Sequence, residues 1–184
     1  MNSFPFMKRI AGKKCLLVGG GNVALRKAEK LIPFGPELTV CAEALHEEFL
    51  KLPVRVFRRG YDRSLLKDMD FVIAATDDRA VNAQISKDCR ECGIAVNSVD
   101  DPENCDFFFP ALICRGDITI GISTGGSSPA LAAVVREYLE SVLPSDLGDI
   151  SKECARLREE KKDAEYVSEV RSLFYRSLRK ENEK

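Results

Sequence analysis

The feature that most constrains this sequence is a run of three glycines, Gly19 to Gly21, that joins an apolar stretch to a helical pattern. The stretch Cys15 to Val18 is typical of a buried strand, and apolar residues after the glycines recur at helical spacing. Gly19, Gly21 and Ala24 form the G-x-G-x-x-A pattern, in which the glycines permit a tight turn and close approach of a pyrophosphate, and the alanine permits close packing of helix on strand. Backbone N–H groups at the start of such a helix favour an anion. The turn therefore predicts a dinucleotide site.

Strand and helix patterns alternate beyond this turn. Further strands are predicted at residues 37–42, 54–57, 70–76 and 94–99. Helical segments are predicted between them at residues 45–52, 62–69 and 80–92. The stretch 70–76 is apolar almost throughout, which is typical of a central strand buried on both faces. Because parallel strands are joined by right-handed crossovers, the alternation predicts an α/β fold with a Rossmann-like parallel sheet and helices on both faces.

The pattern changes in the second half of the chain. Residues 105–114 and 118–123 are predicted to form a hairpin, followed by a helix over 130–142 that Ser128 caps and Pro129 begins. The charged stretch 151–184 predicts two amphipathic helices. We therefore expect a dinucleotide-binding domain at 1–112, a dimerisation region at 113–144 and a C-terminal helical domain at 145–184.

The composition excludes several classes of protein. Hydrophobic residues make up 45% and charged residues 31%, as in globular proteins, and the net charge of −1 gives no general attraction to nucleic acid. We find neither a signal peptide nor eighteen consecutive apolar residues, so we expect a cytoplasmic protein with no membrane or nucleic-acid partner. Seven scattered cysteines favour reduced thiols over a disulfide framework.

Two further positions are candidates for contact with the dinucleotide. Glu43 lies 22 positions after Gly21, where an acid can bind the adenosine ribose, but it could equally open the helix expected at 45–52. Because no arginine follows the second strand immediately, NAD is favoured over NADP. Thr76 follows the buried strand 70–76 and is a second candidate contact, whereas Asp77 and Asp78 suit the N-cap of the next helix.

Two polar turns are candidates for contact with a substrate. Asp100 follows the fifth strand, where a carboxylate can act as a general base or orient a substrate, although it also suits a turn before Pro102. The turn from Thr124 to Pro129 has paired glycines beside a helix start and could receive an anion, or simply cap the helix.

The cysteines and histidine give little support to a metal site. Cys89 and Cys92 have C-x-x-C spacing at a helix end, but no second pair of ligands follows at suitable spacing. His46 is the only histidine and is expected on a solvated helix face. We therefore expect no resident metal.

Five stretches taken together resemble the precorrin-2 dehydrogenases, which occur free-standing or as the N-terminal module of siroheme synthase. Their order and spacing agree over almost the whole chain. The stretches are Val18–Ala24, Ala74–Asp78, Val96–Asp100, Cys105–Pro110 and Ser123–Pro129. The resemblance implies an oxidoreductase that uses NAD to oxidise precorrin-2 to sirohydrochlorin in siroheme biosynthesis.

The resemblance also implies roles for particular residues. Asp100 corresponds to the family's catalytic aspartate, Thr124 to a hydroxyl before the paired glycines, and Asn97 is our candidate for a supporting polar contact. The residues implied in cofactor binding are Gly19, Gly21, Asn22, Val23, Glu43 and Ala44. A homodimer is implied, with the hairpin and the helix from residue 130 at the subunit contact and the C-terminal helices closing over the substrate groove.

Two alternative functions stay open at this point. The chain could also insert Fe²⁺, bound transiently, into sirohydrochlorin, with Asp100 as the proton acceptor in the same cleft. More remotely, it could be an NAD-sensing regulatory domain without catalytic activity. The polar residues at Asp100 and in the Thr124 turn disfavour that second alternative, since a sensor does not need a second anion-receptive turn.

Overall fold

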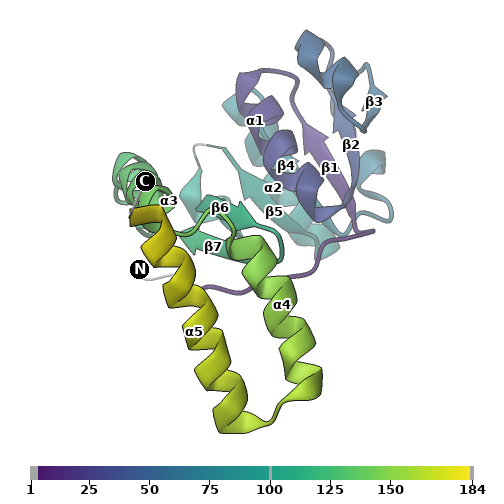
Figure 1. Cartoon of the computed structure of the whole chain (residues 1–184). Helices are drawn as coiled ribbons and strands as arrows, with labels where there is room; N and C mark the ends of the chain where they lie inside the picture. Colours follow the sequence, from purple (N-terminus) through teal and green to yellow (C-terminus); the bar gives the residue numbers. More distant parts are fainter. Residues whose placement is uncertain (1–3, 100, 183–184) are drawn as a thin grey trace. The chain divides into compact units, whose positions relative to one another are not determined.

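The computed structural model describes residues 4–99 and 101–182, which form two compact units that meet in the sequence at Phe108 and Phe109 (Figure 1). We describe each unit by itself. The three-part division that the sequence suggests, at residues 112 and 144, stays a prediction. No helix in the described residues is long and apolar enough to cross a membrane.

The first unit contains a five-stranded parallel sheet, which confirms the predicted Rossmann-like α/β class. The strand order is β3-β2-β1-β4-β5, so the chain reverses direction across the sheet after β3. The strands are β1 (Lys14–Val18), β2 (Glu37–Cys41), β3 (Arg55–Phe57), β4 (Phe71–Ala74) and β5 (Ala95–Ser98). Their carboxyl ends share one edge, where ligands bind in open α/β sheets.

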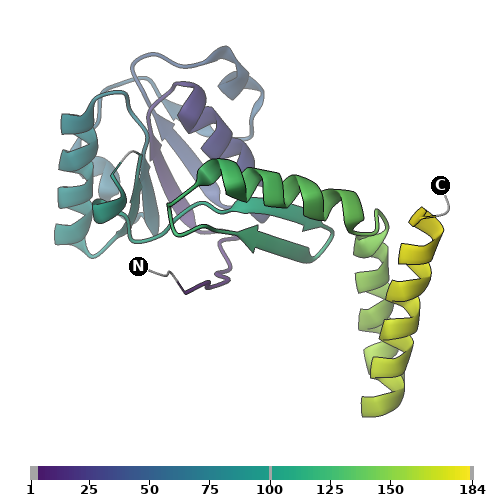
Figure 2. The same cartoon turned by 90° about the vertical axis from the view of Figure 1, so that its left-hand side faces the viewer.

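Two α-helices cover the sheet, one on each face (Figure 2): α1 (Asn22–Leu31) and α2 (Arg79–Cys92). The core beneath α2 joins Leu16, Val72 and Val96 of the strands to Ile85 and Cys89 of that helix. All four residues of β4 are buried, as the apolar stretch 70–76 predicts. Short 3₁₀ helices follow α1 and β5 at η1 (Ile32–Phe34) and η4 (Pro102–Asn104).

The predictions of helices at 45–52 and 62–69 are wrong in both length and type. They are single 3₁₀ turns, η2 (Glu47–Lys51) and η3 (Arg63–Leu66). The first cannot begin earlier, because the His46 amide donates to the Gly20 carbonyl at 2.8 Å and keeps the chain extended there. His46 does not lie on a helix face as expected, since its Nδ1 accepts from the Glu48 amide and caps η2.

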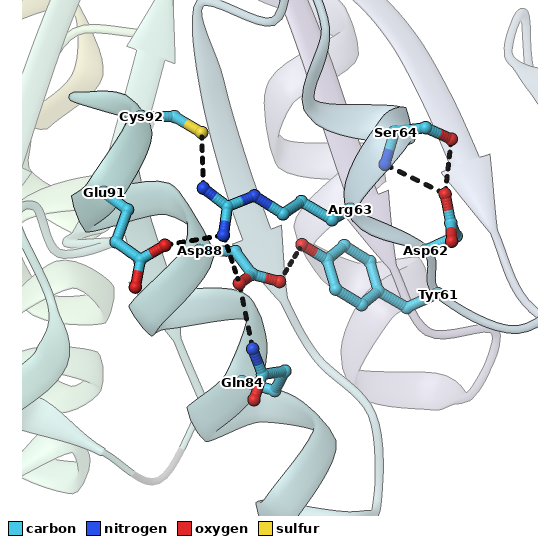
Figure 3. A network of polar contacts seen from close by, with 8 residues as sticks. All are labelled: Tyr61, Asp62, Arg63, Ser64, Gln84, Asp88, Glu91 and Cys92. Atoms are coloured by element: carbon cyan, nitrogen blue, oxygen red, sulfur yellow. Dashed lines mark hydrogen bonds and ion pairs between the residues drawn. The ribbon is translucent and has the colours of Figure 1, made fainter.

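A polar cluster joins the segment after β3 to α2 (Figure 3). The buried carboxylate of Asp88 accepts hydrogen bonds from Tyr61 Oη at 3.0 Å, Gln84 Nε2 at 2.9 Å and Arg63 Nη1 at 3.4 Å. Arg63 also contacts Glu91 and the Cys92 thiol, and Asp62 caps η3 through the Ser64 amide. These bonds fix the chain between β3 and β4 against α2.

The described part of the second unit combines a hairpin with three helices. An antiparallel pair, β6 (Ala111–Arg115) and β7 (Ile118–Ile122), packs against α3 (Pro129–Val142). The helices α4 (Leu147–Glu160) and α5 (Asp163–Asn182) lie side by side (Figure 1). The expected caps are confirmed, since Ser128 Oγ accepts from the Leu131 amide and Pro129 is the first residue of α3.

The first hairpin strand is predicted at 105–114, and this prediction is wrong for the residues before 111. Residues 105–110 are not a strand. Asp106 instead exchanges backbone and side-chain hydrogen bonds with Val96 of β5, and Pro110 lacks the N–H group that a ladder requires. The hairpin therefore begins at Ala111.

Candidate functional site

The three glycines of the turn meet different surroundings. A Cβ on Gly19, whose φ is +125°, would lie 2.2 Å from the carbonyl oxygen of Ala75, and one on Gly20 would lie 2.0 Å from that of Ala44. A Cβ on Gly21 would meet no described atom within 4 Å beyond its chain neighbours. The first two glycines thus let the turn pack against the loops after β4 and β2, and the third leaves open space beside the start of α1.

That start of α1 has no side-chain cap among the described residues. Gly21 is the N-cap residue, and the first turn contains no acidic side chain. In contrast, Asp78 caps α2 through the amides of Ala80 and Val81, at 2.7 and 3.3 Å. Bare N–H groups at the positive end of a helix favour a negatively charged group. The open space at Gly21 and these amides fit the diphosphate of a dinucleotide.

Asn22 and Val23 form the exposed beginning of α1, as expected of residues beside a bound diphosphate. The structure places their backbone directly after the open position at Gly21. Their contact with a cofactor stays a prediction.

The loop after β2 lies against the same turn. The carbonyl of Gly20 accepts a hydrogen bond from the His46 amide, and the backbone of Ala44 lies close enough to exclude a side chain at residue 20. Glu43 is exposed and precedes η2, whose N-cap is His46, so the interpretation of Glu43 as a helix-opening residue is wrong. Its Oε1 atom lies 3.1 Å from where a Cβ on Gly60 would stand. The Glu43 carboxylate therefore stands in a loop at the carboxyl edge of the sheet, between the glycine turn and the segment after β3.

Thr76 is held at the end of β4 by a residue that the sequence did not single out. Asn82 Oδ1 accepts from the Thr76 amide at 3.1 Å and from its hydroxyl at 2.8 Å, and Asn82 Nδ2 donates to the Thr76 carbonyl at 3.0 Å. Ala75, the preceding residue, is the one whose carbonyl abuts Gly19. The structure therefore brings Thr76 beside the glycine turn. No sequence pattern marked Asn82, since polar residues on a helix are common.

Asn97 is buried and links α1 to the segment after β5. Its Oδ1 accepts from Lys27 Nζ at 2.7 Å, and its Nδ2 donates to the Phe107 carbonyl at 2.8 Å. Within the described residues this amide is therefore engaged in internal bonds. Its expected support of catalysis stays a prediction.

Asp100, the candidate catalyst, lies outside the described residues. Val99, which precedes it, donates its amide to the Ala74 carbonyl at 2.9 Å. Thr124 belongs to the second unit, where its Oγ1 accepts from the Ser128 amide at 3.1 Å and its carbonyl accepts from Ser127 Oγ at 2.7 Å. The Thr124 hydroxyl thus helps to form the turn before α3. Its role toward a substrate stays a prediction.

The described residues contain no group of three or more His, Cys, Asp or Glu side chains that could hold a metal ion. Cys89 is buried in the core, which raises the pKa of its thiol to about 12, whereas Cys92 is exposed. The two cysteines of the C-x-x-C pair therefore differ in environment.

Comparison with known proteins finds two family models and a solved structure that match this chain. Residues 6–111 match a family described as putative NAD(P)-binding, and residues 115–141 match one described as sirohaem biosynthesis protein central. A solved structure titled "SirC, precorrin-2 dehydrogenase" superposes with a TM-score of 0.76 at 25% identity, covering 98% of this chain and 96% of that one.

Curated relatives include siroheme synthases from two bacteria. That of Saccharophagus degradans is 37% identical over 182 residues, covering 97% of this chain and 40% of the relative. That of Tolumonas auensis is 42% identical over 153 residues, covering 82% and 33%. The chain thus spans two fifths or less of the length of these relatives.

Proposed function

The chain belongs to the precorrin-2 dehydrogenase and siroheme synthase family, and from this premise we propose that it oxidises precorrin-2 to sirohydrochlorin in siroheme biosynthesis. The observation that carries the proposal is the bare turn at Gly21. Open space there adjoins the uncapped start of α1, at the carboxyl edge of a parallel sheet. A dinucleotide's diphosphate requires this combination of space and free amides.

The cofactor of the proposed reaction is NAD. When bound, it accepts a hydride from a carbon that bridges two rings of the reduced tetrapyrrole. In our proposal the amides of Asn22 and Val23 hold the diphosphate, and the Glu43 carboxylate accepts hydrogen bonds from the adenosine ribose. A carboxylate at that position repels the 2′-phosphate of NADP, so NAD is preferred.

The protein side of the chemistry is proton transfer and orientation. We assign Asp100 to take the proton that the substrate loses as the hydride departs, with Asn97 as a supporting polar residue. The Thr124 turn is assigned to the carboxylates of the tetrapyrrole, because its backbone lies beside the positive end of α3. Oxidation then yields sirohydrochlorin, NADH and one proton.

We also propose that the protein acts as a homodimer through α3. Leu131, Val134, Tyr138 and Val142 recur along one face of this helix, and each is between 42% and 65% exposed. A contiguous apolar stripe of this kind is typical of an interface. The expected cytoplasmic location stays a prediction.

The activity is tested by anaerobic incubation of the protein with precorrin-2 and NAD. We expect the absorption spectrum of sirohydrochlorin to appear together with NADH. Asp100→Asn should lower kcat by about a hundredfold or more while the affinity for NAD changes less than about twofold, since loss of a general base acts on the chemical step. Asp77→Asn is the matched control, because Asp77 is an exposed carboxylate after the neighbouring strand. Near-normal turnover by Asp100→Asn would contradict the assignment.

Two parallel measurements address the finer points. Glu43→Gln should lower the ratio of the NADP dissociation constant to the NAD dissociation constant by roughly tenfold, because the charge that repels the 2′-phosphate is removed. An assay with sirohydrochlorin and Fe²⁺ tests the chelatase alternative, and metal insertion there would add a second activity to the dehydrogenase.

A further inference from the structure

The outer edge of β5 is completed by the segment that follows it. β5 ends the strand order, so one side of its backbone faces away from β4. On that side the Val96 amide donates to Asp106 Oδ2 at 2.8 Å, and the Val96 carbonyl accepts from the Asp106 amide at 2.8 Å. The segment after β5 thus acts as a surrogate strand that satisfies backbone groups of the edge.

Ser98 is the next residue of β5 whose backbone faces this outer edge, and its amide and carbonyl both contact a thiol. Its amide donates to Cys105 Sγ at 3.2 Å, and its carbonyl lies 3.1 Å from the same sulfur. The sulfur also lies 3.2 Å from the carbonyl oxygen of Asp101. One atom therefore contacts the backbone on both sides of residues 99 and 100. We call these contacts of Cys105 with Ser98 and Asp101 the thiol clamp.

A thiol suits this position because it both donates and accepts. Sγ accepts from the Ser98 amide while its proton goes to one of the two carbonyls. Burial raises the pKa of the Cys105 thiol, so the proton is retained at neutral pH. Ser98 is only 4% exposed, and its backbone groups would be costly to leave unpaired there.

We propose that Cys105 is a positioning residue for the dehydrogenase reaction, because its thiol clamp holds Ser98 and Asp101, which lie on either side of the assigned catalyst in the sequence. This inference rests on the proposed function and deepens it. Cys105 acts through the backbone and touches neither hydride donor nor acceptor in the proposed reaction.

Other contacts hold the rest of the segment, so the clamp can be removed without unfolding the unit. Asn97 binds the Phe107 carbonyl, Asp106 binds Val96, and Asn104 Nδ2 donates to Asp101 Oδ2 at 2.7 Å. Arg90 Nη2 in turn donates to Asn104 Oδ1 at 2.6 Å. Loss of the thiol should therefore loosen the backbone at Ser98 and Asp101 and leave the core in place.

The test compares Cys105→Ala and Cys105→Ser with the wild-type protein. Alanine removes the donor and the acceptor, whereas serine retains both. Cys92→Ser is the matched control, since Cys92 is exposed on α2. The measurements are kcat and KM with precorrin-2 and NAD, the midpoint of chemical unfolding, and hydrogen–deuterium exchange of residues 95–107 without ligands.

We expect Cys105→Ala to lower kcat roughly tenfold to a hundredfold, as misplacement of a catalytic group by about an ångström does, with KM for NAD within about twofold of wild type. The Ser98 amide should exchange faster in this variant. Cys105→Ser should recover most of kcat and the slow exchange, and Cys92→Ser should match the wild type.

Four results would overturn the inference or its basis. Wild-type kcat in Cys105→Ala overturns the positioning role, and so does a kcat loss that is matched by equal losses of NAD affinity and unfolding midpoint. Unchanged exchange at Ser98 in that variant overturns the clamp whatever the activity. If the wild-type protein fails to oxidise precorrin-2, the proposed function fails separately, whereas faster exchange at Ser98 still supports the clamp.

Discussion

At the scale of single residues, adjacent glycines serve different purposes. Gly20 is required by packing, because two backbone atoms of Ala44 and the Cβ of Ala42 occupy the space of a side chain. Gly21 adopts φ −85° and ψ −174°, which any residue tolerates, and it faces open space. The fold therefore does not require glycine at this position, and we attribute it to the proposed cofactor.

This difference predicts opposite outcomes for the same substitution. Gly20→Ala should destabilise the protein by about 3 kcal/mol or more, since backbone atoms have to move, as measured by urea unfolding. Gly21→Ala should leave the free energy of unfolding within about 1 kcal/mol of wild type but weaken NAD binding roughly tenfold or more in calorimetry, because the methyl group takes the space of the diphosphate. Unchanged NAD affinity in Gly21→Ala would contradict the proposed cofactor site.

Also at the scale of single residues, Tyr61 makes the free energy of unfolding depend on pH. Burial, and then the hydrogen bond to Asp88, raises the pKa of its hydroxyl above the ordinary value of 10.0. The folded protein therefore holds this proton more tightly than the unfolded chain does. The resulting stability is complete below pH 10 and is lost as the pH rises above it.

Tyr61→Phe tests this dependence. At about pH 8 the variant should be less stable by about 1 kcal/mol, because Asp88 loses a hydrogen bond. Between about pH 8 and about pH 11 the free energy of unfolding of the wild type should fall more than that of the variant, so the gap narrows. A gap that stays constant in denaturant titrations over this range would show that the Tyr61 proton is not held in this way.

At the scale of elements, the two helices of the first unit begin differently. Asp78 caps α2, as the sequence indicates for one of the two aspartates, whereas α1 has no side-chain cap within the described chain. A capped helix gains local stability, and an uncapped one keeps its amides for a ligand. The contrast supports the assignment of α1 to the diphosphate.

The cap predicts a difference between neighbouring aspartates. Asp78→Ala should lower the free energy of unfolding by about 1 kcal/mol, because the amides of Ala80 and Val81 lose their acceptor. Asp77→Ala is the control and should change it by less than about 0.5 kcal/mol, since Asp77 is exposed. Thermal unfolding of both variants checks this, and equal losses would contradict the assigned cap.

At the scale of the whole molecule, α3 has one buried face and a second apolar face that is exposed. Ala132 is buried, whereas Val134 and Tyr138 expose more than half of their surface. An apolar stripe of this length costs free energy in water, so a second copy of the chain is the partner that we propose for it.

Val134→Asp tests the interface. A buried, unpaired charge should dissociate the homodimer, so the mass in sedimentation should fall from about twice 20.5 kDa to that value, with helix content unchanged. Val167→Asp on α5 is the control, because this valine is exposed to a similar extent. A dimer that persists in Val134→Asp, or a wild-type monomer, would contradict the proposed contact.

The sequence by itself determined the glycine turn, the parallel strands, the long helices and two of their caps, because spacing and capping residues act within a few positions along the chain. It overestimated η2, η3 and the first hairpin strand, since these segments are limited by bonds to distant residues such as Gly20 and Val96. Only the tertiary structure decided that Asn82 holds Thr76 and that Cys105 contacts both Ser98 and Asp101. Periodicity in the sequence indicates which side of an element is buried. It does not indicate which residues contact that side, because those residues come from distant parts of the chain.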